Sequence, residues 1–491
     1  MFTKVVVLSS FLICLFAFNC RVLAAGGAIN VKTYGAKGDG VTDDSKAIQD
    51  AISHVSGANT EVDFPVGNYL ISATLKTTAP NTRLVFAPGA KLLLNNNSAG
   101  AINLLHTNCS VEGATIIGNG QTSKDLYTGF GVLLSAVQGC KVSKCNFSKI
   151  SGVSIFLVRS GSKGCVGNII SGNIITSPAI SSKIGSDGSA IMLGYSGTGY
   201  SHTNNVISDN DIDGGQSVCH GVAIMCHGTG NKVMNNRIKN CLKYGIISYE
   251  TAYEDSTLTA TSVIGNTIEH IGAPDGSTTN QGMGIYIMKT HNSVVSGNTI
   301  NQAMVNADNT ETLGRGAISI NGAVGVKVEN NIINNSGRYG IVVVYGFDDD
   351  IRNNKINGTA ESGIYLRNTS GNDISGNELK NVAKYGIRGQ FGSTGKPMYA
   401  TQRVLSRFKN QNTGNGITIT NNRFYGDTKN VIYMTGEDAT TSPGYENLLK
   451  GVNIRENQLI GNNNPAQSCI QLRNVAPGNS NTISRNITSR N

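Results

Sequence analysis

The 491-residue sequence contains no tryptophan and only 9 prolines, and only 14% of its residues are charged. It has no run rich in lysine and arginine and no aromatic-basic motif of the kind that binds RNA, so we expect no nucleic-acid partner. No Cys-x-x-Cys or Cys/His pair has the spacing of a zinc site, so we expect no structural metal. Beyond residue 18, no segment of 18 residues is continuously apolar, which argues against stable membrane insertion.

The first residues are typical of an export signal. Lys4 gives a positive start, residues 5–18 form an apolar run, and Arg21–Ala24 offers a cleavage site before Ala25. The apolar run is too short to span a bilayer stably. We therefore expect residues 1–24 to be a signal peptide and the protein to be periplasmic or extracellular.

The formal net charge of the chain is +9. A soluble surface needs no function to explain such a charge, but a basic protein also attracts an anionic partner. Because nucleic acid is not expected and an export signal precedes the domain, we expect the partner to be an acidic extracellular polysaccharide.

Glycine and asparagine punctuate the chain at regular spacing. There are 60 glycines, and both residue types favour tight turns. Short segments that begin Gly-apolar-x-apolar recur, twice in succession at a distance of 23 residues, and in nine units an asparagine starts a second strand. These glycines are Gly131, Gly152, Gly188, Gly221, Gly245, Gly284, Gly316, Gly340, Gly363 and Gly386. The asparagines are Asn146, Asn173, Asn210, Asn236, Asn266, Asn298, Asn331, Asn354 and Asn377.

A unit of this length cannot bury its apolar side alone, so the units must stack around one core. The sequence predicts an all-β fold, namely a single-stranded right-handed parallel β-helix with an N-terminal capping helix. Residues at Gly+1 and Gly+3 should point inward, those at Gly+2 and Gly+4 outward, and the asparagines should form a ladder. We expect one domain over residues 25–491: a cap and first coils (25–100), regular coils (101–390), and irregular C-terminal coils and loops (391–491).

Two groups of aspartates could be taken for functional sites. Asp43 and Asp44 resemble a catalytic pair, but they precede the helical apolar pattern of Ala47, Ile48, Ala51 and Ile52, so we interpret them as helix-start residues. The run 348–350 consists of three aspartates. We interpret it as a solvated turn, with a calcium site as the alternative.

The segments Val31–Ile52 and Val62–Ile71 resemble the opening of the pectate-lyase superfamily. The resemblance implies a right-handed parallel β-helix with carbohydrate bound in a groove along the coils. Within the superfamily, the chain looks most like secreted tailspike-like exopolysaccharide depolymerases of the stewartan- or amylovoran-processing type. Phage tailspikes form trimers through a C-terminal tail that we do not expect here, so we expect a monomer, with a trimer as the alternative.

Two better-defined families fit less well. Polygalacturonases carry paired aspartates where this chain has Ser186-Asp187, and their Gly-His-Gly motif is only partly matched by Cys219-His220-Gly221. Alginate epimerases carry a Tyr-Gly-Phe-Asp-Pro-His-Glu motif, and the segment Tyr244–Glu250 keeps its tyrosine and glutamate without its aspartate and histidine. Epimerisation by that mechanism is therefore not expected.

Loop insertions flank the Gly-led strand between about residues 150 and 320, and they predict a walled cleft over its outward face. Tyr249 and Tyr286 lie at outward positions, where aromatic rings can stack on sugars, although burial beneath the loops is equally compatible with the pattern. His227 and Lys289 lie near the same strand end and are candidates to contact uronate or hydroxyl groups.

Glycoside hydrolysis usually needs two carboxyl groups, roughly 5–5.5 Å apart for retention and 6.5–9.5 Å for inversion. The preferred candidates are Glu250 with Glu254 or Asp255, at the end of the strand that contains Tyr249. The second pair is Asp187 with His220, which we expect to occupy one column on successive coils. Ordinary solvated turn residues are the alternative for all of these acids.

These patterns favour an endo-acting glycoside hydrolase that cleaves an acidic bacterial exopolysaccharide without a cofactor. The alternative reaction is β-elimination next to a uronate, catalysed by a polysaccharide lyase. It would use Tyr249, Lys289 or His220 as the base, with calcium as a possible neutraliser of the carboxylate. A third possibility is a non-catalytic glycan-binding matrix protein.

Overall fold

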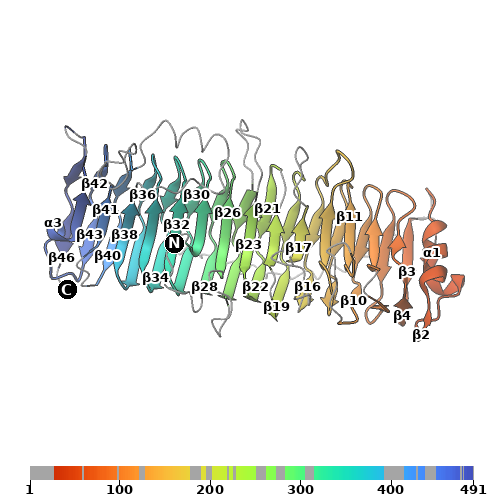
Figure 1. Cartoon of the computed structure of the whole chain (residues 1–491). Helices are drawn as coiled ribbons and strands as arrows, with labels where there is room; N and C mark the ends of the chain where they lie inside the picture. The colour runs from red at the N-terminus through yellow and green to blue at the C-terminus, as the bar shows by residue number, and fades with distance from the viewer. Residues whose placement is uncertain are drawn as a thin grey trace, which may run out of the picture.

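In the computed structural model, the chain forms a long stack of coils whose strands make three parallel sheets (Figure 1). Consecutive strands of a sheet come from consecutive coils. The structure describes residues 27–57, 60–96, 99–120, 128–176, 189–194, 202–217, 220–224, 228–249, 261–272, 282–304, 315–391, 414–426, 430–436, 449–475, 478 and 480–489.

The first sheet has 16 strands within these ranges. They are β1 (Ile29–Asn30), β3 (Glu61–Phe64), β6 (Arg83–Phe86), β9 (Ser110–Glu112), β12 (Lys141–Ser143), β15 (Ile169–Ser171), β18 (Val206–Ser208), β21 (Asn231–Met234), β24 (Thr261–Ile264), β27 (Val294–Ser296), β30 (Lys327–Glu329), β33 (Asp350–Arg352), β36 (Asp373–Ser375), β39 (Thr418–Thr420), β42 (Asn453–Arg455) and β45 (Thr482–Ser484).

The second sheet also has 16 strands within the described residues. They are β2 (Asp39–Asp43), β4 (Asn68–Ile71), β7 (Lys91–Leu94), β10 (Thr115–Ile117), β13 (Asn146–Ser148), β16 (Ile174–Thr176), β19 (Asp211–Ser217), β22 (Arg237–Cys241), β25 (Thr267–Ile271), β28 (Thr299–Ala303), β31 (Ile332–Ser336), β34 (Lys355–Thr359), β37 (Glu378–Val382), β40 (Arg423–Tyr425), β43 (Gln458–Ile460) and β46 (Ile487–Ser489).

The third sheet has 14 strands in the same part of the chain. They are β5 (Leu75–Lys76), β8 (Ile102–Leu104), β11 (Val132–Ser135), β14 (Ile155–Val158), β17 (Ser189–Leu193), β20 (His220–Ile224), β23 (Tyr244–Tyr249), β26 (Met283–Met288), β29 (Gly316–Asn321), β32 (Tyr339–Val344), β35 (Ser362–Arg367), β38 (Tyr385–Gln390), β41 (Ile432–Thr435) and β44 (Ile470–Arg473).

A short 3-10 helix, η1 (Val31–Tyr34), and the helix α1 (Ser45–Ser53) lie at one end of the stack, and α3 (Ala466–Cys469) lies at the other (Figure 1). The predicted helix is confirmed, and it buries Ile48, Ala51 and Ile52. The Asp43 carboxylate accepts hydrogen bonds from the backbone N–H (3.0 Å) and hydroxyl (2.6 Å) of Ser45. The hydroxyl bond lowers the pKa of Asp43, which fits a helix-start residue held ionised by its neighbours.

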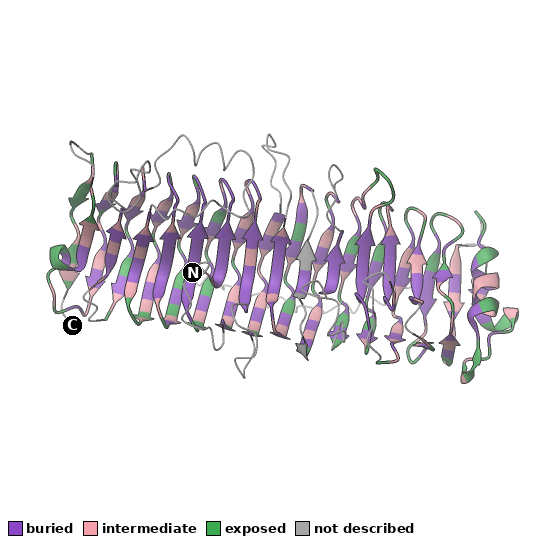
Figure 2. Cartoon of the chain, in the orientation of Figure 1, coloured by how far each residue is buried: buried purple, intermediate pink, exposed green. Residues whose placement is uncertain are grey.

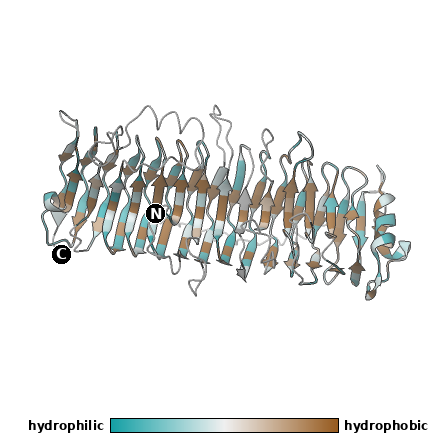
Figure 3. Cartoon of the chain, in the orientation of Figure 1, coloured by the Kyte–Doolittle hydropathy of each residue, from teal (hydrophilic) through white to brown (hydrophobic). Residues whose placement is uncertain are grey.

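The core runs through the whole stack because alternate strand residues point inward. In the third sheet, Ile246, Ile285 and Ile341 sit at the predicted inward positions and are fully buried. Figure 2 shows β32 as buried throughout, whereas β34 of the second sheet alternates with exposed residues. Figure 3 shows the same contrast in hydropathy, with apolar colours along the third-sheet strands of the middle coils. None of the helices in the described ranges is long and apolar enough to cross a membrane.

The predicted asparagine ladder is confirmed in eight of its nine coils. At each step, the backbone N–H and the side-chain amide of one asparagine donate to the Oδ1 of the asparagine on the next coil, at 2.9–3.0 Å. The ladder comprises Asn173, Asn210, Asn236, Asn266, Asn298, Asn331, Asn354 and Asn377, and it continues through Asn422, Asn457 and Asn486. Asn146 was predicted to belong to it and does not. Cys145 occupies that place, because its N–H donates to Asn173 Oδ1 at 3.0 Å.

The prediction that a glycine leads every third-sheet strand at one equivalent position is wrong in three coils. The register places other small residues beside the glycines of neighbouring coils, namely Ser154, Ala190 and Ala317 in place of Gly152, Gly188 and Gly316. This position near the start of these third-sheet strands requires a small residue, because atoms of the neighbouring coils leave little room for a side chain. A Cβ on Gly245 would lie 2.6 Å from Gly284 O and 2.7 Å from Ile268 Cγ2.

Candidate functional site

The corrected register defines two outward columns on the third sheet. One contains Phe156, Met192, Ile247 and Tyr286, in addition to Ala223 of β20. The other pairs Tyr249 with Met288 on the next coil. Phe156 and Met192 are fully buried in a second apolar cluster outside the main core. This end of the face is therefore packed protein.

Tyr249 and Tyr286 are half-buried, and they pack at the edge of that second cluster. The Lys289 ammonium group donates to the Tyr249 hydroxyl at 3.2 Å and lies 5.1 Å from the centre of its ring. Tyr249 ends β23, Tyr286 lies on the neighbouring strand β26, and Lys289 directly follows β26, so the structure brings together three of the four residues predicted to contact substrate. The fourth, His227, lies outside the described residues.

Two neighbours of this group were missed from the sequence. Tyr244, at the start of β23, stacks on Tyr286 with ring centres 5.6 Å apart and planes 26° apart. The side-chain amide of Asn321 donates to the Tyr286 hydroxyl at 3.2 Å, and that hydroxyl donates to Met288 Sδ at 3.2 Å. The only available signal was the Tyr-Gly pair at 244–245, which recurs at 339–340 and 385–386.

The four predicted catalytic carboxyl residues, Glu250, Glu254, Asp255 and Asp187, lie outside the described residues. Glu250 directly follows Tyr249, the last residue of β23. The backbone of His220 begins β20, and its partner in the register is Ser189. The expectation that Asp187 shares a column with His220 is therefore wrong, because the true alignment of β17 differs by two residues from the one based on Gly188.

The second sheet carries a column of alternating charge. Asp213, Lys239 and Glu269 are neighbours on successive coils, and Lys239 Nζ lies 3.2 Å from Asp213. Arg237 lies 3.6 Å from both Asp211 and Glu269. These partly exposed pairs neutralise one another, so this sheet offers little net charge to an anionic polymer.

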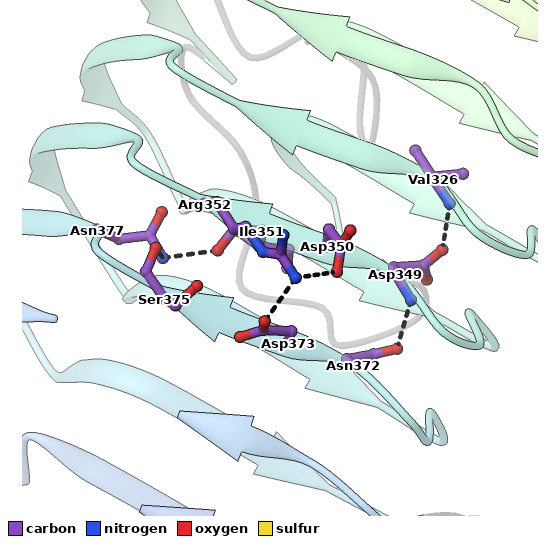
Figure 4. Close-up of polar contacts among 9 residues, drawn as sticks. All are labelled: Val326, Asp349, Asp350, Ile351, Arg352, Asn372, Asp373, Ser375 and Asn377. Carbon is purple, nitrogen blue, oxygen red and sulfur yellow. Dashed lines mark hydrogen bonds and ion pairs between the residues drawn. The ribbon is translucent and has the colours of Figure 1, made fainter. Parts of the chain in front are cut away.

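The aspartate run at 348–350 is a structural turn. Asp349 is fully buried, its Oδ1 accepts the N–H of Val326 at 2.8 Å, and its own N–H donates to Asn372 at 3.1 Å (Figure 4). The expectation of a solvated turn is therefore wrong for Asp349, which bonds to the neighbouring coils as the ladder asparagines do. Arg352 bridges Asp350 (2.9 Å) and Asp373 (2.7 Å). Across the described ranges, no three metal-ligating side chains lie together.

Comparison with known proteins defines the class. The family model for the right-handed β-helix region matches residues 223–398. The protein is a right-handed parallel β-helix, as predicted. More particularly, residues 28–247 match the model described as rhamnogalacturonase A/epimerase, pectate lyase-like.

Two solved structures share the fold at low identity. The surface adhesin PfbA of Streptococcus pneumoniae is 17% identical with a TM-score of 0.58, over 76% of this chain and 94% of its own. The catalytic domain of the GH87 α-1,3-glucanase variant D1068A, in complex with tetrasaccharides, is 15% identical with a TM-score of 0.53, over 69% of this chain and 64% of its own. At this identity, the likeness shows the fold alone.

A curated relative matches only locally. Over 54 residues the chain is 46% identical to the non-secreted LysM effector LysM19 of Penicillium expansum. The match covers 11% of this chain and 4% of the length of that effector.

Proposed function

We propose that the protein is an exported, monomeric, endo-acting glycoside hydrolase that depolymerises an acidic exopolysaccharide. The observation that carries the proposal is the group of Tyr249, Tyr286 and Lys289 on the outward face of the third sheet. Half-buried tyrosine rings offer apolar faces to sugar rings, and the adjoining ammonium group offers a charge to a carboxylate. The basic net charge of +9 favours the same class of ligand.

The comparisons support this reading. The pectate-lyase-like family model that matches residues 28–247 is described by a rhamnogalacturonase and an epimerase, both of which act on sugars. The GH87 α-1,3-glucanase, which shares the fold, is described in complex with tetrasaccharides. We infer that the coils serve the same kind of ligand here.

For the reaction, we assign Glu250 with Glu254 or Asp255 as the acid and base, since Glu250 follows Tyr249 directly in the chain. A protonated carboxyl would donate to the leaving oxygen, and an ionised one would activate water or attack the sugar. Asp187 and His220, each by itself, remain the second set of candidates.

One observation favours a polysaccharide lyase as the second candidate function. The Lys289 ammonium group donates to the Tyr249 hydroxyl. In this reaction an ionised Tyr249 would accept the C5 proton of a uronate, the bond from C4 to the leaving oxygen would break as the double bond forms, and the ammonium group would balance the developing charge. In this version, calcium or His220 would assist in neutralising the carboxylate.

The test is incubation of the purified protein with acidic exopolysaccharide from the organism that makes it. A hydrolase produces new reducing ends without ultraviolet absorbance, whereas a lyase produces an unsaturated, absorbing product. Glu250→Gln should lower the hydrolase rate roughly 10²-fold or more, and Tyr249→Phe should do so for a lyase. Glu269→Gln, on the second sheet, is the matched control and should keep full activity.

Each outcome bears on a different part of the proposal. A fully active Glu250→Gln variant would show that Glu250 is not a catalytic residue. Asp187 and His220 would then be the remaining candidates for a hydrolase. Wild-type protein that binds the polymer and leaves its viscosity unchanged would contradict an enzyme of either class. It would favour a binding protein, in the manner of the adhesin that shares its fold.

A further inference from the structure

The outward face of the third sheet changes character beyond β32. The Tyr286 column continues as Ser319, Val342, Tyr365, Arg388, Tyr433 and Gln471, and the Tyr249 column continues as Met288, Asn321, Val344, Arg367, Gln390, Thr435 and Arg473. Three arginines and no carboxylate occupy these positions from β35 to β44. On the second sheet of these coils, Lys380 is paired with Glu378 at 2.8 Å, whereas no acid occupies the two third-sheet columns beside their arginines.

The cations of this face lie against tyrosine rings. The Arg388 guanidinium group lies 5.6 Å from the centre of the Tyr365 ring and 5.3 Å from that of Tyr385. The guanidinium group of Arg473 lies 5.4 Å from the ring of Tyr433, which is itself 5.5 Å from the ring of Tyr385. Arginine held against an aromatic ring keeps its planar fork available for a carboxylate while losing little side-chain entropy.

These side chains are held in place and partly open to solvent. The Tyr365 hydroxyl donates to Gln390 at 2.6 Å, which fixes the buried ring beneath Arg388. Arg388, Tyr385 and Tyr433 are half-buried, and Arg473 is exposed. We name the set of Tyr385, Arg388, Tyr433 and Arg473 the arginine–tyrosine patch.

The patch lies in line with the proposed catalytic region. Four coils separate Tyr286 on β26 from Arg388 on β38, and two more lead to β44. At about 4.8 Å per coil, the patch begins about 19 Å from Tyr286 and ends about 29 Å away along the axis. Only a polymer that lies along the third sheet can contact both ends.

Resting on the proposed function, we propose that the arginine–tyrosine patch is a remote anion-binding subsite. It holds carboxylate-bearing sugars of a long polysaccharide chain while the chain is cut near Tyr249. Each guanidinium group binds a carboxylate by paired N–H donation, and the tyrosine faces contact the sugar rings. Long acidic chains are therefore preferred over short ones and over neutral ones.

The test compares chain lengths and charges on the full-length protein. Substrates are the acidic exopolysaccharide of the producing organism, the same polymer with its carboxyl groups reduced to alcohols, and oligosaccharide fragments too short to span β26 to β44. Arg388→Ala/Arg473→Ala should raise KM for the long acidic polymer about tenfold, and leave kcat and the KM of short fragments unchanged. Because Arg473 is exposed, Arg473→Glu alone is the second variant, and a rise in the same KM is expected.

The chain provides a matched control on another face. Lys380 Nζ lies 4.3 Å from the centre of the Tyr425 ring on the second sheet, so Lys380→Ala removes an equivalent cation–tyrosine contact and should change nothing. Unchanged KM for long chains in both arginine variants would overturn the proposal while the proposed function stands. Equal KM for the native and carboxyl-reduced polymers would also overturn it. Failure of the wild-type protein to bind or cut any of these polymers would overturn both.

Discussion

The asparagine ladder and the outward face of the third sheet both repeat once per coil, yet only the ladder repeats its residue. From Asn173 to Asn377, every ladder side chain donates to one coil and accepts from another, and an amide of this length does both. Positions on the outward face do not repeat one bond from coil to coil, and their residues range from Phe156 to Arg388. Stacking therefore determines the residue type in the asparagine ladder. The residues on the outward face of the third sheet can instead differ from coil to coil and serve a ligand.

The largest expected effect comes from breaking the ladder. Asn354→Ala removes the Oδ1 that accepts two hydrogen bonds from Asn331, and it removes the amide that donates to Val328 O. Leaving these buried groups without partners should lower the free energy of unfolding by about 3–5 kcal/mol. The measurement is the midpoint of chemical unfolding.

Asn357→Ala, three residues further along the chain and exposed on β34, is the control and should change stability by less than about 0.5 kcal/mol. If both substitutions lowered the free energy of unfolding equally, a ladder asparagine would contribute no more to stability than a surface residue. The contrast between the two regions would then be lost.

A smaller effect should follow from acid at a histidine that serves the stacking in the same way. His202 Nδ1 accepts the backbone N–H of Cys165 at 3.0 Å. Burial, assisted by the charge of Arg159, lowers the pKa of His202 to about 4 from 6.5. The unfolded chain therefore binds this proton more readily. Its contribution to stability is complete above about pH 6.5 and falls by up to about 3 kcal/mol as the pH approaches 4.

The measurement is the free energy of unfolding between pH 7 and pH 4, compared for wild type and His202→Asn. The variant cannot titrate at this position, so its curve should be flatter in that window. Parallel curves for the two proteins would show that His202 is not the group responsible.

The smallest expected effect concerns the outward face of the third sheet. Lys289→Ala removes the ammonium group that donates to the Tyr249 hydroxyl at 3.2 Å. Affinity for the acidic polymer should fall about tenfold, or about 1.4 kcal/mol, with the unfolding midpoint unchanged. Affinity electrophoresis measures the first quantity and thermal unfolding the second. A stability loss without an affinity loss would make Lys289 a structural residue.

The fold was predictable because stacking repeats its requirements in every coil. The glycines, the inward aliphatic residues and the asparagines all stand at fixed places in the sequence, and the parallel sheets follow from them. The errors fall where one coil substitutes an equivalent residue. Cys145 takes the place expected for Asn146, and Ala190 takes the place expected for Gly188, since a backbone N–H or a small side chain satisfies the same neighbour.

The candidate site was predictable only in part. Tyr249, Tyr286 and Lys289 were identified from alternation and loop placement, and the structure brings them together. Tyr244 and Asn321 were missed because each contacts Tyr286 from a different coil, across insertions of unequal length. The arginine–tyrosine patch was missed for the same reason, since only the register reveals that its members are neighbours.

The central claim is that the polymer lies along the third sheet. Hydroxyl-radical footprinting of the tyrosines, with and without bound acidic polysaccharide, tests it most directly. The account predicts that bound polymer protects Tyr249, Tyr385 and Tyr433 on the third sheet and leaves Tyr425 on the second sheet unprotected. Protection of Tyr425 without protection of the three third-sheet tyrosines would contradict it.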